Sequence, residues 1–171
     1  KLKTVCIQLK QLWLQHLEKD KMDIIRYKET DSTNLRAKEA GNEGVSQDTL
    51  FIADKQTKGV GRRGRSWESK DADNEYMSLL LKPEIEPSKA PMLTLVMAIA
   101  VAMTLQEVCG TDFQIKWPND IIFNKKKVCG ILTEMVLDGT EMKYVVIGVG
   151  INVNQKTFPA ELEDKATSLS L

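Results

Sequence analysis

The sequence holds little of the chemistry that metal centres and redox sites need. Its 171 residues include one histidine, His16, and three cysteines, Cys6, Cys109 and Cys129. No two of these cysteines have the spacing of a metal-binding pair, so we expect no zinc site. An odd number of free thiols is typical of a protein from a reducing compartment, and we therefore expect a cytoplasmic location.

The chain also lacks an excess of charge of either sign. Lys plus Arg and Asp plus Glu number 24 each, for a formal net charge of +0. There is thus no overall field that would attract nucleic acid or an anionic membrane, and any such role would need a local patch.

Long hydrophobic runs are missing as well. The most apolar stretch, residues 92–103, is shorter than the roughly 20 residues that cross a bilayer, and it is predicted to be a core helix. The start, Lys1-Leu2-Lys3, does not have the pattern of a signal peptide. We therefore expect a soluble protein with no membrane partner.

What the sequence does contain is enough apolar residues, 42% of the chain, for one globular domain with a sizeable core. Residues 1–22 have apolar side chains at helical spacing and predict an amphipathic helix, a possible linker to a preceding domain. Residues 23–171 are predicted to form the main domain.

Strands outnumber helices in this main domain. Helices are predicted from the capping residues Asp31-Ser32-Thr33-Asn34 to a stop at Gly41, and from about 91 to 108 with a stop at Gly110. Strands are predicted at 24–27, 49–53, 76–81, 113–117, 121–123, 128–137 and 143–153, with a hairpin turn at Asp138-Gly139. The predicted fold class is α+β, with a mixed or antiparallel sheet flanked by helices.

A polar, glycine-rich stretch between the second and third predicted strands is the first candidate site. Gly59-Val60-Gly61-Arg62-Arg63-Gly64 fits the dinucleotide pattern G-x-G-x-x-G, but no amphipathic helix follows it, so the dinucleotide interpretation fails. No P-loop sequence occurs either. The remaining features, flexible glycines, Arg62, Arg63, Arg65 and then Trp67, favour binding of an anion. That anion could be a small ligand, or a single-stranded nucleic acid with Trp67 stacked on a base.

Three further stretches favour a small anionic ligand. Lys116-Trp117-Pro118-Asn119-Asp120 places polar side chains where a strand must turn, although ordinary turn chemistry would give the same pattern. Lys127 stands at the entrance of an apolar strand, where its ammonium could point into a site. In Gly148-Val149-Gly150-Ile151-Asn152 two glycines interrupt a β-branched strand, which usually marks a bulge or the close approach of a ligand or another backbone.

Taken in order, these stretches resemble the motifs of the biotin–protein ligase family. The resemblance runs from about residue 23 to 170 and includes Asp31–Asn34, Gln56, the Gly59–Arg65 loop with Trp67, Lys116–Asp120, Lys127–Leu132 and Gly148–Asn152. It implies a mixed sheet flanked by helices, like the class II aminoacyl-tRNA synthetase core. It also implies activation of biotin by ATP and Mg²⁺ to biotinyl-5′-adenylate, followed by transfer to a lysine of a biotin carboxyl carrier protein.

The resemblance carries roles to particular positions. Arg62 and Lys127 are the implied catalytic residues, since a carboxylate and an α-phosphate repel each other and need fixed positive charge. The implied biotin-binding residues are Ser32, Thr33, Asn34, Gln56, Gly59, Gly61, Arg62, Trp67, Lys127, Gly130 and Gly148. The implied nucleotide-binding residues are Arg62, Arg65, Trp67, Asn119, Asp120, Lys127 and Asn152, and Asp120 is also the implied Mg²⁺ ligand.

The sequence departs from the family pattern in three places. Val60 stands where the bacterial pattern usually has another arginine, which predicts weaker retention of the adenylate. The family normally continues after residue 171 into a small SH3-like domain, whose absence would affect acceptor docking. No winged helix-turn-helix is present, so we expect DNA binding only if a preceding domain existed. A homodimer is possible. A lipoate–protein ligase and a nucleic-acid-binding module remain the alternatives.

Overall fold

The computed structural model describes residues 22–67 and 74–171. The amphipathic helix predicted within residues 1–22 lies almost wholly outside this described part. The assignment of residues 23–171 to one catalytic domain remains a prediction.

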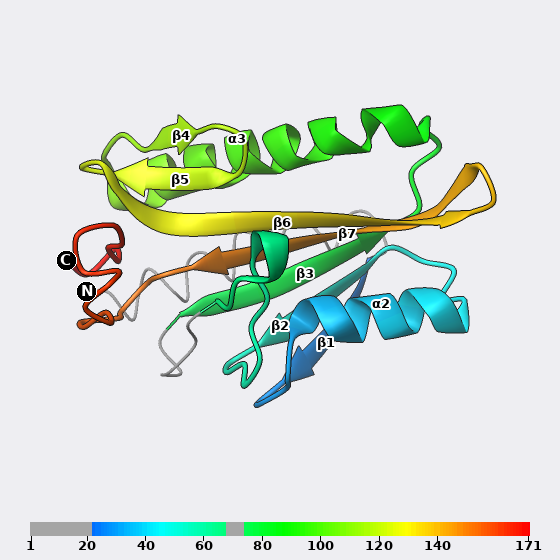
Figure 1. The fold of residues 1–171 in the computed structure, drawn as a ribbon, viewed down its shortest axis with the longest axis horizontal. Helices are drawn as coiled ribbons and strands as arrows, with labels where there is room; N and C mark the ends of the chain where they lie inside the picture. The colour runs from blue at the N-terminus through cyan, green and yellow to red at the C-terminus, as the bar shows by residue number, and fades with distance from the viewer. Residues whose placement is uncertain (1–21, 68–73) are drawn as a thin grey trace.

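The described residues form a seven-stranded mixed sheet in the order β1-β2-β3-β7-β6-β5-β4 (Figure 1). The strands are β1 Asp23–Tyr27, β2 Thr49–Ala53, β3 Glu75–Leu81, β4 Gln114–Lys116, β5 Asp120–Phe123, β6 Lys126–Asp138 and β7 Glu141–Ile151. Only the β1–β2 pair among them is parallel. The predicted fold class is confirmed, and Gly139, with φ 62°, makes the turn predicted between β6 and β7.

Helix α2, Thr33–Glu43, lies on one face of the sheet, and its predicted end is wrong. Gly41 does not stop the helix; Gly44 does, with a left-handed φ of 90°. A Cβ at Gly41 would lie only 2.8 Å from the ring of Tyr144. Gly41 is therefore a packing residue, which lets the helix approach β7.

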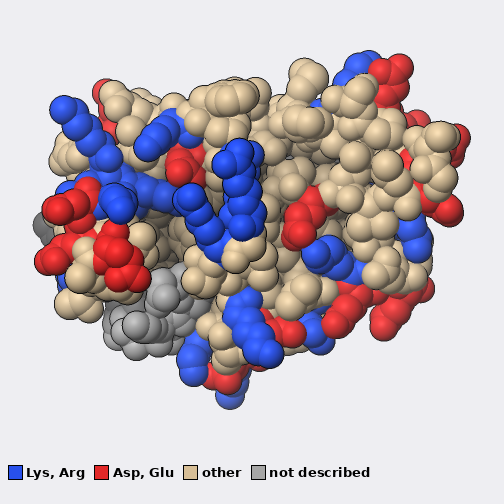
Figure 2. Space-filling view, viewed as in Figure 1, with Lys and Arg blue, Asp and Glu red and all other residues tan. Residues whose placement is uncertain are grey.

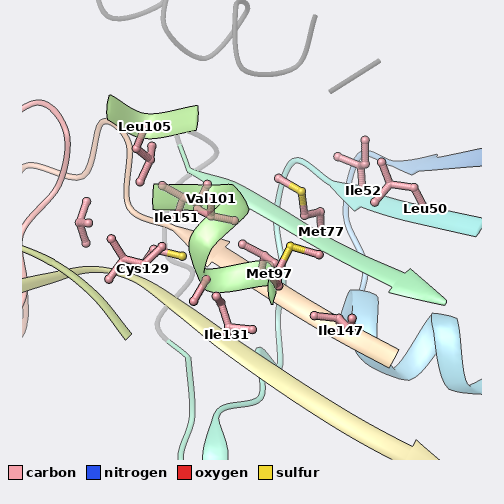
Figure 3. Close-up of a cluster of buried hydrophobic side chains, with 14 of the residues drawn as sticks. Leu50, Ile52, Met77, Met97, Val101, Leu105, Cys129, Ile131, Ile147 and Ile151 are labelled. Carbon is pink, nitrogen blue, oxygen red and sulfur yellow. The ribbon is translucent and has the colours of Figure 1, made fainter. Parts of the chain in front are cut away.

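Helix α3, Ala90–Cys109, follows a short 3-10 turn, η2 Pro87–Lys89, covers the opposite face and ends at Gly110 as predicted. Its inner side packs Met97, Val101 and Leu105 onto the sheet (Figure 3). Its outer side is not core, because Met92 and Met103 are 60% and 65% exposed. The description of residues 92–103 as a core helix is thus right for one side only.

The full helical segment Pro87–Cys109 is long and apolar enough to cross a membrane by length and composition. The apolar stretch of residues 92–103 is too short by itself to predict this. In the structure the inner side of the segment is occupied by the sheet, as Figure 3 shows.

The sheet face that carries α2 has a hollow where β7 contains glycines in place of larger residues. Along β7 the residues on this face are Tyr144, Val146, Gly148 and Gly150. The side chains therefore become smaller along the strand, and the last two positions have none. Tyr144 and Val146 form a core with residues of α2 and β2. The glycines beyond them leave an open floor, which positions the site described next.

Candidate active site

The floor of the site is a patch of glycines on β6 and β7 with a tryptophan ring seated on it. Gly130 and Gly150 are direct cross-strand partners. A Cβ at either position would lie 2.6 or 2.7 Å from the Trp67 indole. The glycines therefore allow a contact with a flat aromatic ring that any larger residue would prevent.

The loop that delivers Trp67 folds back on itself. The backbone N–H of Trp67 donates to the carbonyl of Gly59 at 2.9 Å, and the backbone N–H of Gly61 donates to the carbonyl of Arg65 at 2.7 Å. Between them the 3-10 turn η1, Arg62–Gly64, holds Arg63 at a positive φ of 57°. This loop projects over the α2 face of the sheet (Figure 1). The stretch is thus an arginine-bearing turn and not the start of a dinucleotide-binding helix.

Buried hydroxyl and amide groups line the end of the site next to α2. Gln56 Oε1 accepts hydrogen bonds from the backbone N–H of Thr33 at 2.8 Å and from its hydroxyl at 3.1 Å. Ser78 Oγ lies 2.7 Å from Thr33 Oγ1 and 2.6 Å from Asn34 Oδ1. Both bonds to Gln56 use its oxygen, so its Nε2 group remains a donor for a ligand.

A chain of charged and polar groups crosses the other end of the site. Arg62 Nη1 donates to Asn119 Oδ1 at 2.8 Å, and Asn119 Nδ2 donates to Asp120 Oδ1 at 3.1 Å. Asp120 in turn pairs with Lys127 Nζ at 2.7 Å. Lys127 Nζ also stands 5.2 Å from the centre of the Trp67 ring. Arg62 and Lys127 therefore belong to one contiguous network.

These groups surround two cavities that meet. The smaller is lined by Ser32, Thr33, Asn34, Gln56 and the glycine floor at 130, 148 and 150. The larger takes its basic side chains from Arg62, Arg63, Arg65, Lys116, Lys125, Lys127 and Lys165. Gly61, Arg62, Trp67, Asn119 and Lys127 line both cavities, so they form the boundary between them.

Charge on this part of the surface is strongly one-sided although the whole chain is neutral. Asp120 is the one acidic side chain among the described residues that line the larger cavity. Figure 2 shows Lys and Arg side chains gathered around this part of the surface. A local basic patch of this kind favours a multiply charged anion, such as a polyphosphate, over a neutral ligand.

The far wall of the larger cavity comes from the C-terminal segment. The backbone of Lys127 donates to Lys165 at 2.7 Å and accepts from Thr167 at 2.8 Å, which ties this segment beside β6. Asn152 lies just beyond β7, and its amide donates to the carbonyl of Thr167 at 3.1 Å. Phe158 and Leu162 add apolar surface to the same cavity.

Two titratable groups near the site have shifted pKa values. Burial raises the pKa of the Cys129 thiol above its usual range, so this side chain stays protonated and is not a nucleophile. Burial also raises the pKa of Asp31, but hydrogen bonds from Ser32 and Thr30 and the charge of Arg36 outweigh it and hold the pKa below its usual value. Asp31 is therefore a charged anchor at the start of α2.

The structure brings nearly all of the predicted site residues together. Those that line a cavity are Ser32, Thr33, Asn34, Gln56, Gly61, Arg62, Arg65, Trp67, Asn119, Asp120, Lys127, Gly130, Gly148 and Asn152. Gly59 lines neither cavity; its carbonyl instead accepts the hydrogen bond that sets Trp67 in place. The chemical roles of these residues stay predictions.

Several residues at the site were not predicted from the sequence. Ser78 of β3 lies behind the cavity lining and carries a signal that could have been found, because a polar side chain buried among apolar neighbours needs a partner. Phe158, Leu162 and Lys165 carry no such signal, since no periodic pattern places their segment against β6.

Comparison with known proteins gives a consistent result. The chain matches the Biotin/lipoate A/B protein ligase family over residues 25–152. It is 49% identical over 141 residues to the Bifunctional ligase/repressor BirA of Bacillus subtilis, an alignment that covers 81% of this chain and 43% of that protein. It is 36% identical over 140 residues to the Biotin--[acetyl-CoA-carboxylase] ligase of Paracoccus denitrificans, covering 81% and 58%. The chain thus spans about half the length of these relatives.

Among solved structures, the chain resembles the biotin protein ligase from Aquifex aeolicus in complex with biotin and ATP. The TM-score is 0.72 at 41% sequence identity, and the match covers 86% of this chain and 59% of that one.

Proposed function

The chain belongs to the biotin/lipoate A/B protein ligase family, and from this we propose that it is a biotin–protein ligase. It joins biotin to ATP to give biotinyl-5′-adenylate and pyrophosphate. It then transfers the biotinyl group to a lysine of a biotin carboxyl carrier protein. A cytoplasmic location is part of the proposal, and the free thiols of Cys109 and Cys129 support it.

The observation that carries the proposal is the junction of two chemically different cavities at Arg62 and Lys127. The small cavity ends in amide and hydroxyl groups, which suit the cyclic urea of biotin, with its one carbonyl acceptor and two N–H donors. The large basic cavity suits a nucleoside triphosphate. A biotin that enters with its urea at the end next to α2 directs its carboxylate to the junction.

The chemistry at the junction is the attack of one anion on another. A carboxylate oxygen of biotin forms a bond to the α-phosphorus of ATP, and the bond from that phosphorus to the pyrophosphate oxygen breaks. In the second reaction a carrier lysine attacks the acyl carbon and AMP leaves. Arg62 and Lys127 offset the repulsion between carboxylate and phosphate and stabilise the charge that spreads over the phosphoryl oxygens. Trp67 keeps water from the anhydride.

The residues present also fit a Mg²⁺ ion carried in by ATP. Such an ion typically takes one or two carboxylates, phosphate oxygens and water, and Asp120 is the carboxylate that lines the phosphate end of the larger cavity. Residues 22–67 and 74–171 contain no group of three or more side chains that would hold a metal alone. We therefore assign Asp120 as the protein ligand of a substrate-bound Mg²⁺, where the ion would neutralise phosphate charge.

This assignment predicts the effect of Asp120→Asn on the Mg²⁺ requirement. The Mg²⁺ concentration for half-maximal adenylate formation should rise at least several-fold, because an amide oxygen binds Mg²⁺ more weakly than a carboxylate. The measurement is the initial rate against Mg²⁺ concentration at saturating ATP and biotin. Asp138→Asn, at the exposed end of β6, is the matched control. An unchanged Mg²⁺ dependence in Asp120→Asn would remove Asp120 from the role of metal ligand.

The function itself is tested by incubating the protein with ATP, Mg²⁺ and either biotin or lipoate and analysing bound products by mass spectrometry. We expect biotinyl-AMP and no lipoyl-AMP. Formation of lipoyl-AMP alone would identify a lipoate ligase. Absence of both adenylates, together with binding of single-stranded nucleic acid that falls steeply with salt, would favour the nucleic-acid-binding alternative.

A further inference from the structure

We propose that Glu134, held by Lys38, is a positioning residue that fixes the orientation of the Asn34 amide and thereby the hydrogen-bonding pattern that the small cavity offers to its ligand. Neither Glu134 nor Lys38 lines the cavity. The proposal rests on the proposed function, because it takes the urea of biotin to be the group that is recognised.

The proposal starts from three linked contacts between α2 and β6. Asn34 Nδ2 donates to Glu134 Oε2 at 2.9 Å. Lys38 Nζ, one helical turn further along α2, donates to the other carboxylate oxygen, Oε1, at 2.8 Å. Asn34 is 6% exposed, so its polar atoms depend on these protein partners. The Glu134 and Lys38 side chains are each 30% exposed, so their charges are partly shielded from water.

The charge of Glu134 sets which end of the Asn34 amide faces it. An ionised carboxylate can only accept hydrogen bonds, so the amide must present its NH₂ group there. Its oxygen then faces Ser78, whose hydroxyl lies 2.6 Å away and donates to it. Turning the amide over would bring its oxygen against the carboxylate. Ser78 alone would not prevent this, since a hydroxyl can donate or accept.

The floor of the cavity holds the amide closely on its other side. A Cβ at Gly148 would collide with Asn34 Oδ1, so the amide lies directly on the backbone of β7. The second proton of Asn34 Nδ2 and the Nε2 group of Gln56 are then donors at the end of the cavity next to α2. This pattern favours a ligand with a carbonyl acceptor there, as a cyclic urea has.

The test uses a glutamine at position 134, because its side-chain amide has an oxygen that accepts hydrogen bonds and an NH₂ group that donates them. In Glu134→Gln, the ammonium of Lys38 can only donate and therefore takes the amide oxygen of residue 134. The NH₂ of residue 134 then faces Asn34, which must turn over. We expect the dissociation constant for biotin, measured by calorimetry, to rise about 5- to 100-fold, the range for a buried polar group that loses its partner. The dissociation constant for ATP should stay unchanged.

Removing the ammonium of Lys38 as well should restore the affinity for biotin. In the double variant Lys38→Met, Glu134→Gln, no ammonium holds the oxygen of residue 134, so this oxygen can turn to Asn34 and re-create the original polarity. We expect biotin affinity within about threefold of wild type, well below the loss caused by one unsatisfied buried group. If the ion pair were merely structural, its loss would lower the melting temperature without changing the affinity of the folded protein for biotin. Melting temperatures of all variants separate stability from binding.

Glu39→Gln is the matched control, since Glu39 is exposed on the same helix and pairs with Arg36; its biotin affinity should equal that of wild type. A wild-type affinity in Glu134→Gln, or a double variant as weak as the single one, would overturn the positioning role. Failure of the wild-type protein itself to bind biotin would instead overturn the proposed function.

Discussion

Replacement of Lys127 by alanine is expected to slow formation of biotinyl-5′-adenylate by about 100- to 1000-fold, as loss of one preorganised donor to a developing charge does in other enzymes. Lys127 lines both cavities and reaches the boundary between them from the start of β6. Its Nζ is held by Asp120 at 2.7 Å, so it is oriented before a ligand arrives. The measurement is biotin-dependent exchange of pyrophosphate into ATP.

Arg62→Ala should have an effect of the same size in this assay, because Arg62 lines the same boundary from the opposite loop. Lys143→Ala, an exposed position on β7 away from both cavities, is the control for loss of a positive charge and should leave the rate unchanged. Wild-type exchange rates in both Arg62→Ala and Lys127→Ala would show that the charges of these two residues do not assist the reaction.

The second large effect is expected from the addition of one methyl group at Gly148. Its Cβ would collide with Asn34 Oδ1, so Asn34 must move and lose its contacts with Ser78 and Glu134. We expect Gly148→Ala to weaken biotin binding by about 100-fold, because several buried polar groups lose partners together. Overpacking should also lower the free energy of unfolding by about 1–3 kcal/mol. Calorimetry with biotin and chemical denaturation are the measurements.

Gly41→Ala separates the effect on biotin binding from the effect on the free energy of unfolding. A Cβ at Gly41 would meet the Tyr144 ring at 2.8 Å, a comparable overlap in the core between α2 and the sheet, outside the cavity lining. This variant should lose stability and keep its affinity for biotin. Equal losses of affinity in the two glycine variants would mean that the effect of Gly148→Ala comes from general destabilisation.

The strands and both described α-helices were predictable because their patterns are local. Val128 to Leu137 and Lys143 to Val153 are apolar and β-branched, and Asp138-Gly139 between them is a turn sequence, so the β6–β7 hairpin follows. The end of α2 was mispredicted because Gly41 and Gly44 are equally good local stop signals. Packing against Tyr144, more than 100 residues away in the sequence, explains the glycine at position 41.

The site was predictable where residue types are unusual for their position. Arginines between glycines, and glycines in an apolar strand, are poor choices for folding alone, and both line the cavities. The Glu134–Lys38–Asn34 contacts could not be predicted, because Glu134 in β6 looks like an ordinary solvent-facing strand residue. Only the packing of α2 across the sheet brings it to Asn34.

The most direct test of this account is a crystal structure of the protein with biotinyl-5′-adenylate bound. We expect Lys127 Nζ and the Arg62 guanidinium both to lie within about 3.2 Å of oxygens of the acyl-phosphate group, the outer limit of a good N–H···O hydrogen bond. The urea should lie at the end of the small cavity next to α2, near Gln56 and Asn34. Either cation directed away from the acyl-phosphate would contradict the claim that these two charges bring the carboxylate and the phosphate together.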